Sequence, residues 1–89
     1  MQTISILVKG RVQGVYYRQT AKEKALSLNI TGTVRNLPGG DVELIATGEA
    51  ALLRELINWC REGPPRALVT EIKTSELPLQ SFTGFLIIR

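Results

Sequence analysis

The fold is decided within residues 3–28, which read TISILVKGRVQGVYYRQTAKEKALSL. In residues 3–8 apolar and polar side chains alternate, apart from Leu7, as they do in a half-buried strand. From about residue 18 to residue 28 the apolar side chains recur every three to four positions, which indicates one face of an amphipathic helix. Two glycines separate these patterns, so the segment predicts a strand, a loop and a helix.

Short motifs mark the start of this helix and the hairpin that follows it. Residues 20–23, Thr-Ala-Lys-Glu, have the spacing of a capping box, which would start the helix about two residues after Arg18. Residues 30–37 and 41–47 are rich in β-forming side chains and flank Pro38-Gly39-Gly40. Because proline and glycine supply the backbone angles of a turn, we predict a β-hairpin there.

The second half of the chain adds one helix and two strands. Residues 49–62 carry a second apolar helical stripe that ends at Gly63-Pro64-Pro65, which cannot continue a helix. Residues 67–74 and 81–88 are predicted as strands separated by a proline-containing loop. Cys60 lies on the apolar stripe, so we interpret it as a small buried apolar group rather than a redox centre.

The predicted elements follow in the order strand, helix, strand, strand, helix, strand, strand. The first six match the split β-α-β pattern of ferredoxin-like folds, and a final strand is appended. We therefore expect an α+β fold, a two-layer α/β sandwich in which two helices cover one face of a five-stranded antiparallel sheet. With 89 residues the chain is expected to be one domain, residues 1–89, because this length supports a single core.

This topology directs attention to one edge of the sheet. In a split β-α-β unit the first and second strands run parallel, so their carboxyl ends lie at the same edge. We expect residues 11–17 and Asn36 to converge there, in front of the first helix. Ligands bind beyond strand ends in such arrangements, which predicts the position of a functional site.

The composition excludes several kinds of catalytic site. The chain has no histidine and one cysteine, so it can form neither a Ser-His-Asp or Cys-His relay nor an imidazole or multi-thiolate metal site. Its net charge of +3 comes from arginines and lysines that are spread along the chain. This distribution favours a local anion site over a nucleic-acid-binding face.

The expected location follows from the cysteine and the N-terminus. Cys60 has no disulfide partner in the chain, which favours a reducing compartment. The N-terminus lacks the basic segment and cleavage site of a signal peptide, and no apolar run approaches the ~20 residues of a membrane span. We therefore expect a cytoplasmic protein without membrane or nucleic-acid partners.

Residues 10–18, Gly-Arg-Val-Gln-Gly-Val-Tyr-Tyr-Arg, combine a glycine-bracketed turn with an arginine in the first helical turn. Unpaired N–H groups of the turn and the helix start form a concave anion site that suits phosphate. Arg18 would add a charge and two donors in the geometry of two phosphate oxygens. The local pattern also fits an ordinary connection with a solvent-exposed arginine, and it matches neither a P-loop nor a dinucleotide-binding motif.

Three motifs together resemble those of the acylphosphatase family. They are GRVQGVYYR at residues 10–18, GTVRN at residues 32–36 and Val42-Glu43, and the family signature is G-x-V-Q-G-V-x-F-R followed by G-W-V-x-N. The resemblance extends over nearly the whole chain, with Tyr17 in place of phenylalanine and Thr33 in place of tryptophan. It implies a ferredoxin-like sandwich with a five-stranded sheet, and hydrolysis of the carboxyl–phosphate bond of acyl phosphates.

The resemblance also implies roles for individual residues. Arg18 matches the family's phosphate-binding arginine, and Asn36 matches the asparagine that orients the attacking water. Loop amides would hold the phosphoryl oxygens, and they belong to Val12, Gln13, Gly14, Val15, Tyr16 and Tyr17. The substrate phosphate itself would take the proton of the water.

The predicted chemistry needs neither a metal nor a cofactor. The leaving carboxylate departs without being protonated, because its conjugate acid has a pKa of ~4. What the protein must supply is an in-line water and stabilisation of charge on the phosphoryl oxygens. The expected partner is a small-molecule acyl phosphate, bound by a monomer.

Two other functions stay open at this point. Residues 9–17 faintly resemble the RNP1 motif of RNA-binding domains, although RNP1 needs aromatic side chains on a central strand. A phosphate-sensing or carbamoyl-phosphate-handling domain is another possibility, because acylphosphatase-like modules also occur within hydrogenase-maturation carbamoyltransferases, although a free-standing chain speaks against it. Arg11 and Arg35 flank the predicted site and could add positive potential there.

Overall fold

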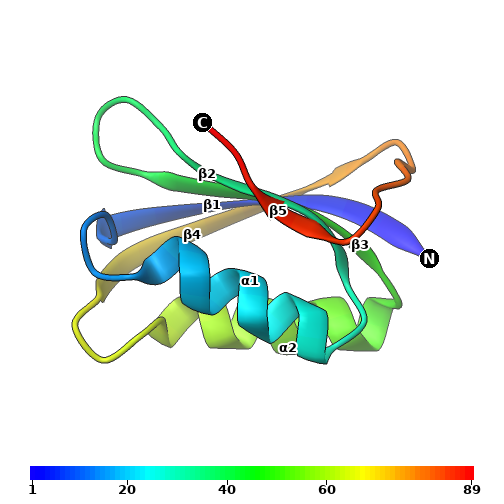
Figure 1. Ribbon diagram of the computed structural model, residues 1–89, viewed down its shortest axis with the longest axis horizontal. Helices are drawn as coiled ribbons and strands as arrows, with labels where there is room; N and C mark the ends of the chain where they lie inside the picture. Colours follow the sequence, from blue (N-terminus) through cyan, green and yellow to red (C-terminus); the bar gives the residue numbers. More distant parts are fainter.

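The computed structural model describes all residues from 1 to 89 and contains five strands and two helices (Figure 1). In chain order the elements are β1 (Gln2–Arg11), α1 (Tyr17–Ser27), β2 (Thr31–Asn36), β3 (Val42–Gly48), α2 (Ala50–Glu62), β4 (Leu68–Leu77) and β5 (Phe85–Ile87). The predicted succession of strands and helices is confirmed.

The strands form one sheet in the order β4-β1-β3-β2-β5. β3 pairs antiparallel with both β1 and β2, so β1 and β2 run in the same direction and end at the same edge, as predicted. Both helices lie on one face of this sheet (Figure 1). The arrangement confirms the ferredoxin-like two-layer sandwich.

β5 shows that the prediction of a fully antiparallel sheet is wrong. This strand pairs parallel with β2, with Phe85 opposite Gly32 and Ile87 opposite Val34, so the sheet is mixed. β4 forms the opposite edge of the sheet and runs against the direction of β2. A chain that reverses after β4 and crosses to the other edge therefore arrives running along β2.

The last two strands also differ in length from their predictions. β4 extends to Leu77 instead of ending at residue 74, whereas β5 is limited to Phe85–Ile87 instead of residues 81–88. The chain between them is held by side chains, because the Gln80 N–H donates to Thr3 Oγ1 at 2.9 Å and the Thr47 hydroxyl donates to the Gln80 carbonyl at 2.9 Å. Sequence alternation does not distinguish such contacts from a strand ladder.

α1 begins at Tyr17, one residue before the predicted start, and the predicted capping box is wrong. Thr20 lies inside the first turn, where its hydroxyl donates to the Tyr16 carbonyl, and Glu23 accepts a hydrogen bond from the Gln19 amide at 3.1 Å. The N-cap is Tyr16, whose backbone is left-handed with φ 63° and whose side chain caps nothing. The path of the preceding loop, rather than a local capping motif, therefore starts this helix.

The core lies between the sheet and the two helices. On the helices the buried side chains are Tyr17, Ala21 and Ala25 of α1 and Leu53, Leu56 and Cys60 of α2, which confirms both stripes and the burial of Cys60. The small alanines of α1 leave room for the larger apolar side chains of the strands. Each fully buried leucine or isoleucine contributes roughly 1.5–3 kcal/mol to burial in such a core.

Tyr17 joins the two helices. Its side chain is 1% exposed, its hydroxyl donates to the Cys60 carbonyl at 2.7 Å, and its ring centroid lies 5.3 Å from that of Trp59. The Cys60 carbonyl would ordinarily accept the N–H of the residue four positions later, but that residue is Pro64, which has no N–H. Tyr17 therefore supplies the missing donor and fixes the start of α1 against the end of α2.

Replacing Tyr17 with phenylalanine is expected to lower the free energy of unfolding by about 1–2 kcal/mol, because the buried Cys60 carbonyl loses its donor. For a domain of this size each kcal/mol corresponds to a fall in Tm of about 4–8 °C. Urea denaturation and calorimetry measure the effect. Tyr16→Phe is the matched control, because that side chain is 77% exposed and should leave stability unchanged. Equal stability of the two variants would contradict this role.

The buried Cys60 thiol predicts a loss of stability in alkaline solution. Burial raises the pKa of Cys60 from its ordinary value of 9.0 to about 12. Between these values the unfolded chain releases the thiol proton and the folded chain keeps it, so the unfolded state binds fewer protons and stability falls as pH rises. We expect the free energy of unfolding to decline above a pH of about 9.

The Cys60→Ala variant identifies the group that is responsible. Its decline should begin at a higher pH, where tyrosines of the unfolded chain ionise near their ordinary pKa of about 10. Burial also raises the pKa of Tyr17, so that group continues the decline in both proteins. Urea midpoints measured over a pH series give the onset. The same onset in wild type and Cys60→Ala would refute the assignment to Cys60.

Candidate active site

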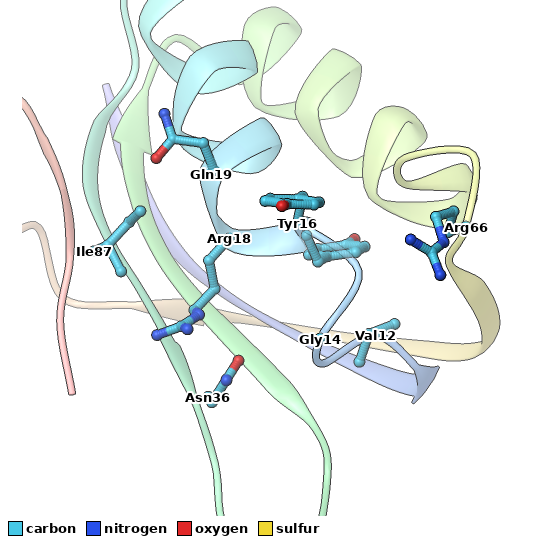
Figure 2. A pocket seen from close by; sticks show the side chains of 9 residues that line it. Val12, Gly14, Tyr16, Arg18, Gln19, Asn36, Arg66 and Ile87 are labelled. Atoms are coloured by element: carbon cyan, nitrogen blue, oxygen red, sulfur yellow. The ribbon is translucent and has the colours of Figure 1, made fainter.

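A cavity of about 520 Å³ opens at the edge of the sheet where β1 and β2 end (Figure 2). It is lined by Val12, Gly14, Tyr16, Tyr17, Arg18, Gln19, Asn36, Arg66 and Ile87. These residues come from the loop after β1, the first turn of α1, the end of β2, the loop after α2 and β5. The predicted convergence of residues 11–17 with Asn36 is confirmed.

The loop between β1 and α1 is held in place from both ends. At Gly10 the pairing of β1 with β4 shifts register, and a Cβ there would lie 2.2 Å from the Leu68 carbonyl oxygen, so only glycine fits. Gln13 then anchors the loop, because its side-chain amide donates to the carbonyls of Leu37 at 2.9 Å and Asp41 at 2.8 Å. These bonds fix the loop relative to the end of β2, where Asn36 lies.

The start of α1 supplies free backbone donors to the cavity. No side chain caps the helix and no acidic residue lies in its first turn. Thr20 is the first residue whose N–H reaches a carbonyl four positions earlier, that of Tyr16. The preceding N–H groups therefore have no helical partner, and the helix dipole adds positive charge at this end. The geometry is that of an anion site.

Two loop residues adopt backbone conformations that place them around this site. Gly14 has φ +75°, which favours glycine, and a Cβ there would meet no atom within 4 Å. Tyr16 has φ 63°, a strained value for a bulky side chain. Both residues line the cavity. The strain at Tyr16 is of the kind that concentrates at functional sites.

Arg18 and Asn36 come from different elements and point toward one another (Figure 2). Arg18 is partly exposed and forms no ion pair. Asn36 Oδ1 is buried and has no hydrogen-bond partner in the chain. Because a buried acceptor without a donor costs about 1–3 kcal/mol, the site favours a bound group that donates a hydrogen bond to Asn36.

The structure brings most of the predicted site residues together, but not all of them. Six of the eight line the cavity, namely Arg18, Asn36, Val12, Gly14, Tyr16 and Tyr17. Gln13 and Val15 do not, because Gln13 is bound to the hairpin and Val15 is only 8% exposed and packs into the core. Their backbone amides, rather than their side chains, were the predicted groups.

Sequence reasoning missed Gln19, Arg66 and Ile87. Arg66 reaches the cavity because Leu68 pairs with Arg11, which places the start of β4 beside the loop after β1. Ile87 reaches it because β5 runs parallel to β2 and ends at the same edge. Both depend on strand register, which no local motif records. An arginine directly after the rigid Gly63-Pro64-Pro65 segment was the one available signal.

The electrostatics of the cavity come from two arginines. Arg18 and Arg66 line it, and none of its lining residues is acidic. Arg11 and Arg35 do not line the cavity, so neither would contact a ligand bound there directly. Arg35 is also paired with Glu43 at 2.9 Å. A neighbouring pair, Lys9 with Asp41 at 2.9 Å, raises the pKa of Lys9 through its hydrogen bond.

The position of Tyr17 speaks against the RNA-binding alternative. Tyr17 lies in a helix and is buried, unlike the exposed aromatic side chain on a central strand that an RNP1 motif needs. Histidine, cysteine, aspartate and glutamate side chains form no group of three or more that could hold a metal ion. Neither helix has the length and apolar character needed to cross a membrane.

The chain is similar to known proteins over nearly its whole length. The family model named Acylphosphatase matches residues 4–87. An acylphosphatase of Marinobacter nauticus is 54% identical over 81 residues, which cover 90% of this chain and 88% of that protein. An acylphosphatase of Methylococcus capsulatus is 49% identical and covers 100% of this chain and 98% of its own. The crystal structure of acylphosphatase from Bacillus subtilis superposes with a TM-score of 0.97 at 32% identity, over 100% of both chains. This chain belongs to the acylphosphatase family.

Proposed function

We propose that the protein hydrolyses acyl phosphates to a carboxylate and inorganic phosphate in the cavity around Arg18 and Asn36. The observation that carries the proposal is the convergence of an unpaired arginine, an uncapped helix start and an unpaired asparagine oxygen on one cavity. Family membership, with relatives named acylphosphatase that match over nearly their full length, supports it. The same matches favour hydrolysis over a carbamoyl-phosphate-handling role.

The phosphoryl group binds where the positive charge is concentrated. Free N–H groups of residues 12–17 and of the first turn of α1 surround its oxygens, and Arg18 adds a bidentate charged contact. These donors are fixed before the substrate arrives, because Gln13 holds the loop and Tyr17 holds the helix start. Donors that need not reorganise stabilise the charge that builds up on the equatorial oxygens in the transition state.

Asn36 positions the water. The unpaired Oδ1 accepts a hydrogen bond from the water. This bond holds the water oxygen next to the phosphorus, on the side opposite the acyl oxygen, ready for in-line attack. The new O–P bond forms as the bond between phosphorus and the acyl oxygen breaks, and the electron pair leaves with the carboxylate. Because no acidic side chain lines the cavity, the proton of the water passes to a phosphoryl oxygen. The carboxylate needs no proton, since the pKa of its conjugate acid is about 4.

An assay with benzoyl phosphate tests this function. The purified protein should hydrolyse benzoyl phosphate in the presence of EDTA, because every group assigned here is a side chain or a backbone amide. It should not hydrolyse p-nitrophenyl phosphate at a comparable rate, since an ester must expel a more basic oxygen. No hydrolysis of benzoyl phosphate, or hydrolysis only with added metal, would contradict the proposal.

We also propose that the protein acts as a monomer in the cytoplasm. The groups that the proposed mechanism uses, Arg18, Asn36 and the loop amides, all belong to the same chain, so the mechanism does not require a second copy. The free and buried thiol of Cys60 is compatible with a reducing compartment. Light scattering after size-exclusion chromatography gives the oligomeric state, and a molar mass of two chains at assay concentration would refute the monomer.

A further inference from the structure

Arg66 is a second cationic group in the cavity, separate from the phosphate-binding loop. It lies in the loop between α2 and β4, whereas Arg18 lies in the first turn of α1. In Figure 2 the two guanidinium groups lie on opposite sides of Tyr16. All three residues line the same cavity. The cavity therefore offers a second positive charge, which comes from a different segment of the chain than the predicted phosphate-binding groups.

The backbone around Arg66 is fixed. Pro64 and Pro65 precede it, and the turn from Pro64 to Ala67 is closed by a hydrogen bond from the Ala67 N–H to the Pro64 carbonyl at 2.9 Å. Directly after the turn, Leu68 pairs with Arg11. The prolines fix φ before Arg66, and the pairing of Leu68 with Arg11 fixes the backbone after it. The position from which the Arg66 side chain extends is therefore preorganised.

Arg66 is also free to bind an anion. The three ion pairs of the chain are Lys9 with Asp41, Arg35 with Glu43 and Lys73 with Glu71. Neither Arg66 nor Arg18 takes part in them, and no acidic residue lines the cavity. Two unpaired arginines without a counter-charge favour a ligand that carries two separate negative groups.

The size of the cavity is consistent with such a ligand. Its volume of about 520 Å³ exceeds what a phosphoryl group occupies, since a single water takes about 30 Å³ of liquid volume. The ring of Tyr16 is 77% exposed and lies between the two arginines in Figure 2. It offers an apolar face for the part of the ligand that connects the two negative groups.

Resting on the proposed acyl phosphate hydrolysis, we propose that Arg66 determines specificity by binding a negative group on the acyl portion of the substrate. The preferred substrates are then acyl phosphates whose acyl group carries a second anion, such as a distal carboxylate. The phosphoryl group binds at Arg18, the acyl chain crosses Tyr16, and the distal anion contacts Arg66.

The test compares two substrates that differ by one carboxylate, 4-carboxybenzoyl phosphate and benzoyl phosphate. In Arg66→Gln the ratio of their kcat/KM values should fall about tenfold, mainly through KM, as expected for one charge-assisted contact at a partly solvated site. Arg66→Lys should keep most of the preference because it keeps the charge. Arg54→Gln removes an exposed arginine of α2 outside the cavity and should leave the ratio unchanged.

An unchanged ratio in Arg66→Gln, or an equal change in Arg54→Gln, would overturn the proposal. Failure of the hydrolase function looks different, because wild type would then hydrolyse neither substrate. A binding measurement covers that case. Calorimetry with 4-carboxybenzylphosphonate and benzylphosphonate should show tighter binding of the carboxylated compound to wild type, and Arg66→Gln should lose that difference. Equal binding of both phosphonates by wild type would also overturn the role of Arg66.

Discussion

Replacing Arg18 with alanine is expected to lower kcat for benzoyl phosphate at least about 100-fold, the loss typical when one preorganised transition-state donor is removed. The loss should reach that level because the variant removes both a charge and a bidentate contact, and because Arg66 is the only other cation that lines the cavity. The Michaelis constant should rise, and inhibition by inorganic phosphate should weaken. Steady-state kinetics with benzoyl phosphate measure these effects.

Two further variants show which property of Arg18 matters. Arg18→Lys keeps the charge but loses the planar pair of donors, so it should be nearly as impaired as Arg18→Ala. Arg54→Ala removes an exposed arginine of α2 and should retain wild-type kinetics. Near-normal hydrolysis by Arg18→Ala would show that the loop amides alone hold the phosphoryl group, and it would refute the proposed role.

Replacing Asn36 with alanine is expected to lower kcat about 100-fold while phosphate inhibition changes by less than about twofold. The physical reason is that Asn36 acts on the water, whereas Arg18 and the backbone amides act on the phosphate. Kinetics with benzoyl phosphate and inorganic phosphate as inhibitor separate the two effects. Asn58→Ala changes an exposed asparagine of α2 and is the control. A large loss of phosphate affinity in Asn36→Ala would instead place Asn36 among the phosphate-binding groups.

Stability measurements give an independent check on both residues. Asn36→Ala removes a buried oxygen that has no donor, so it should not destabilise the protein. Arg18→Ala removes a positive charge from the positive end of a helix dipole and introduces a better helix former, so it should be neutral or slightly stabilising. A residue that costs stability where it lies and whose removal abolishes activity is retained for function.

Much of the fold could be predicted because local patterns report local structure. The alternation in β1 and the apolar stripes of both helices placed these elements within a few residues of their observed positions. The start of α1 was harder, since the strained Tyr16 and the path of the loop decide it, and neither leaves a capping motif in the sequence. The length of β5 was also overestimated, because Gln80 and the two threonines replace ladder bonds with side-chain bonds.

Some residues of the site could likewise be predicted from the sequence, and others could not. Arg18 and Asn36 could be predicted because they lie in the motifs that resemble the family, and because β1 and β2 run in the same direction and end at one edge of the sheet. Arg66 and Ile87 could not, because each reaches the cavity through a strand pairing between distant segments, Leu68 with Arg11 and Val34 with Ile87. The unpaired state of Asn36 Oδ1 likewise exists only once the surrounding side chains are packed.

The amino-acid sequence by itself thus determined the order of elements and the absence of histidine chemistry, since periodicity and composition are properties of the chain. Its resemblance to the family motifs also led to the prediction that Arg18 and Asn36 are the principal residues of the site. Only the tertiary structure decided the direction of β5, the donor that the Cys60 carbonyl receives from Tyr17 and the second arginine of the cavity. These contacts depend on strand register and on packing between segments that are far apart in the chain. Many local sequences are compatible with the same strand or loop, so the whole fold decides which contacts form.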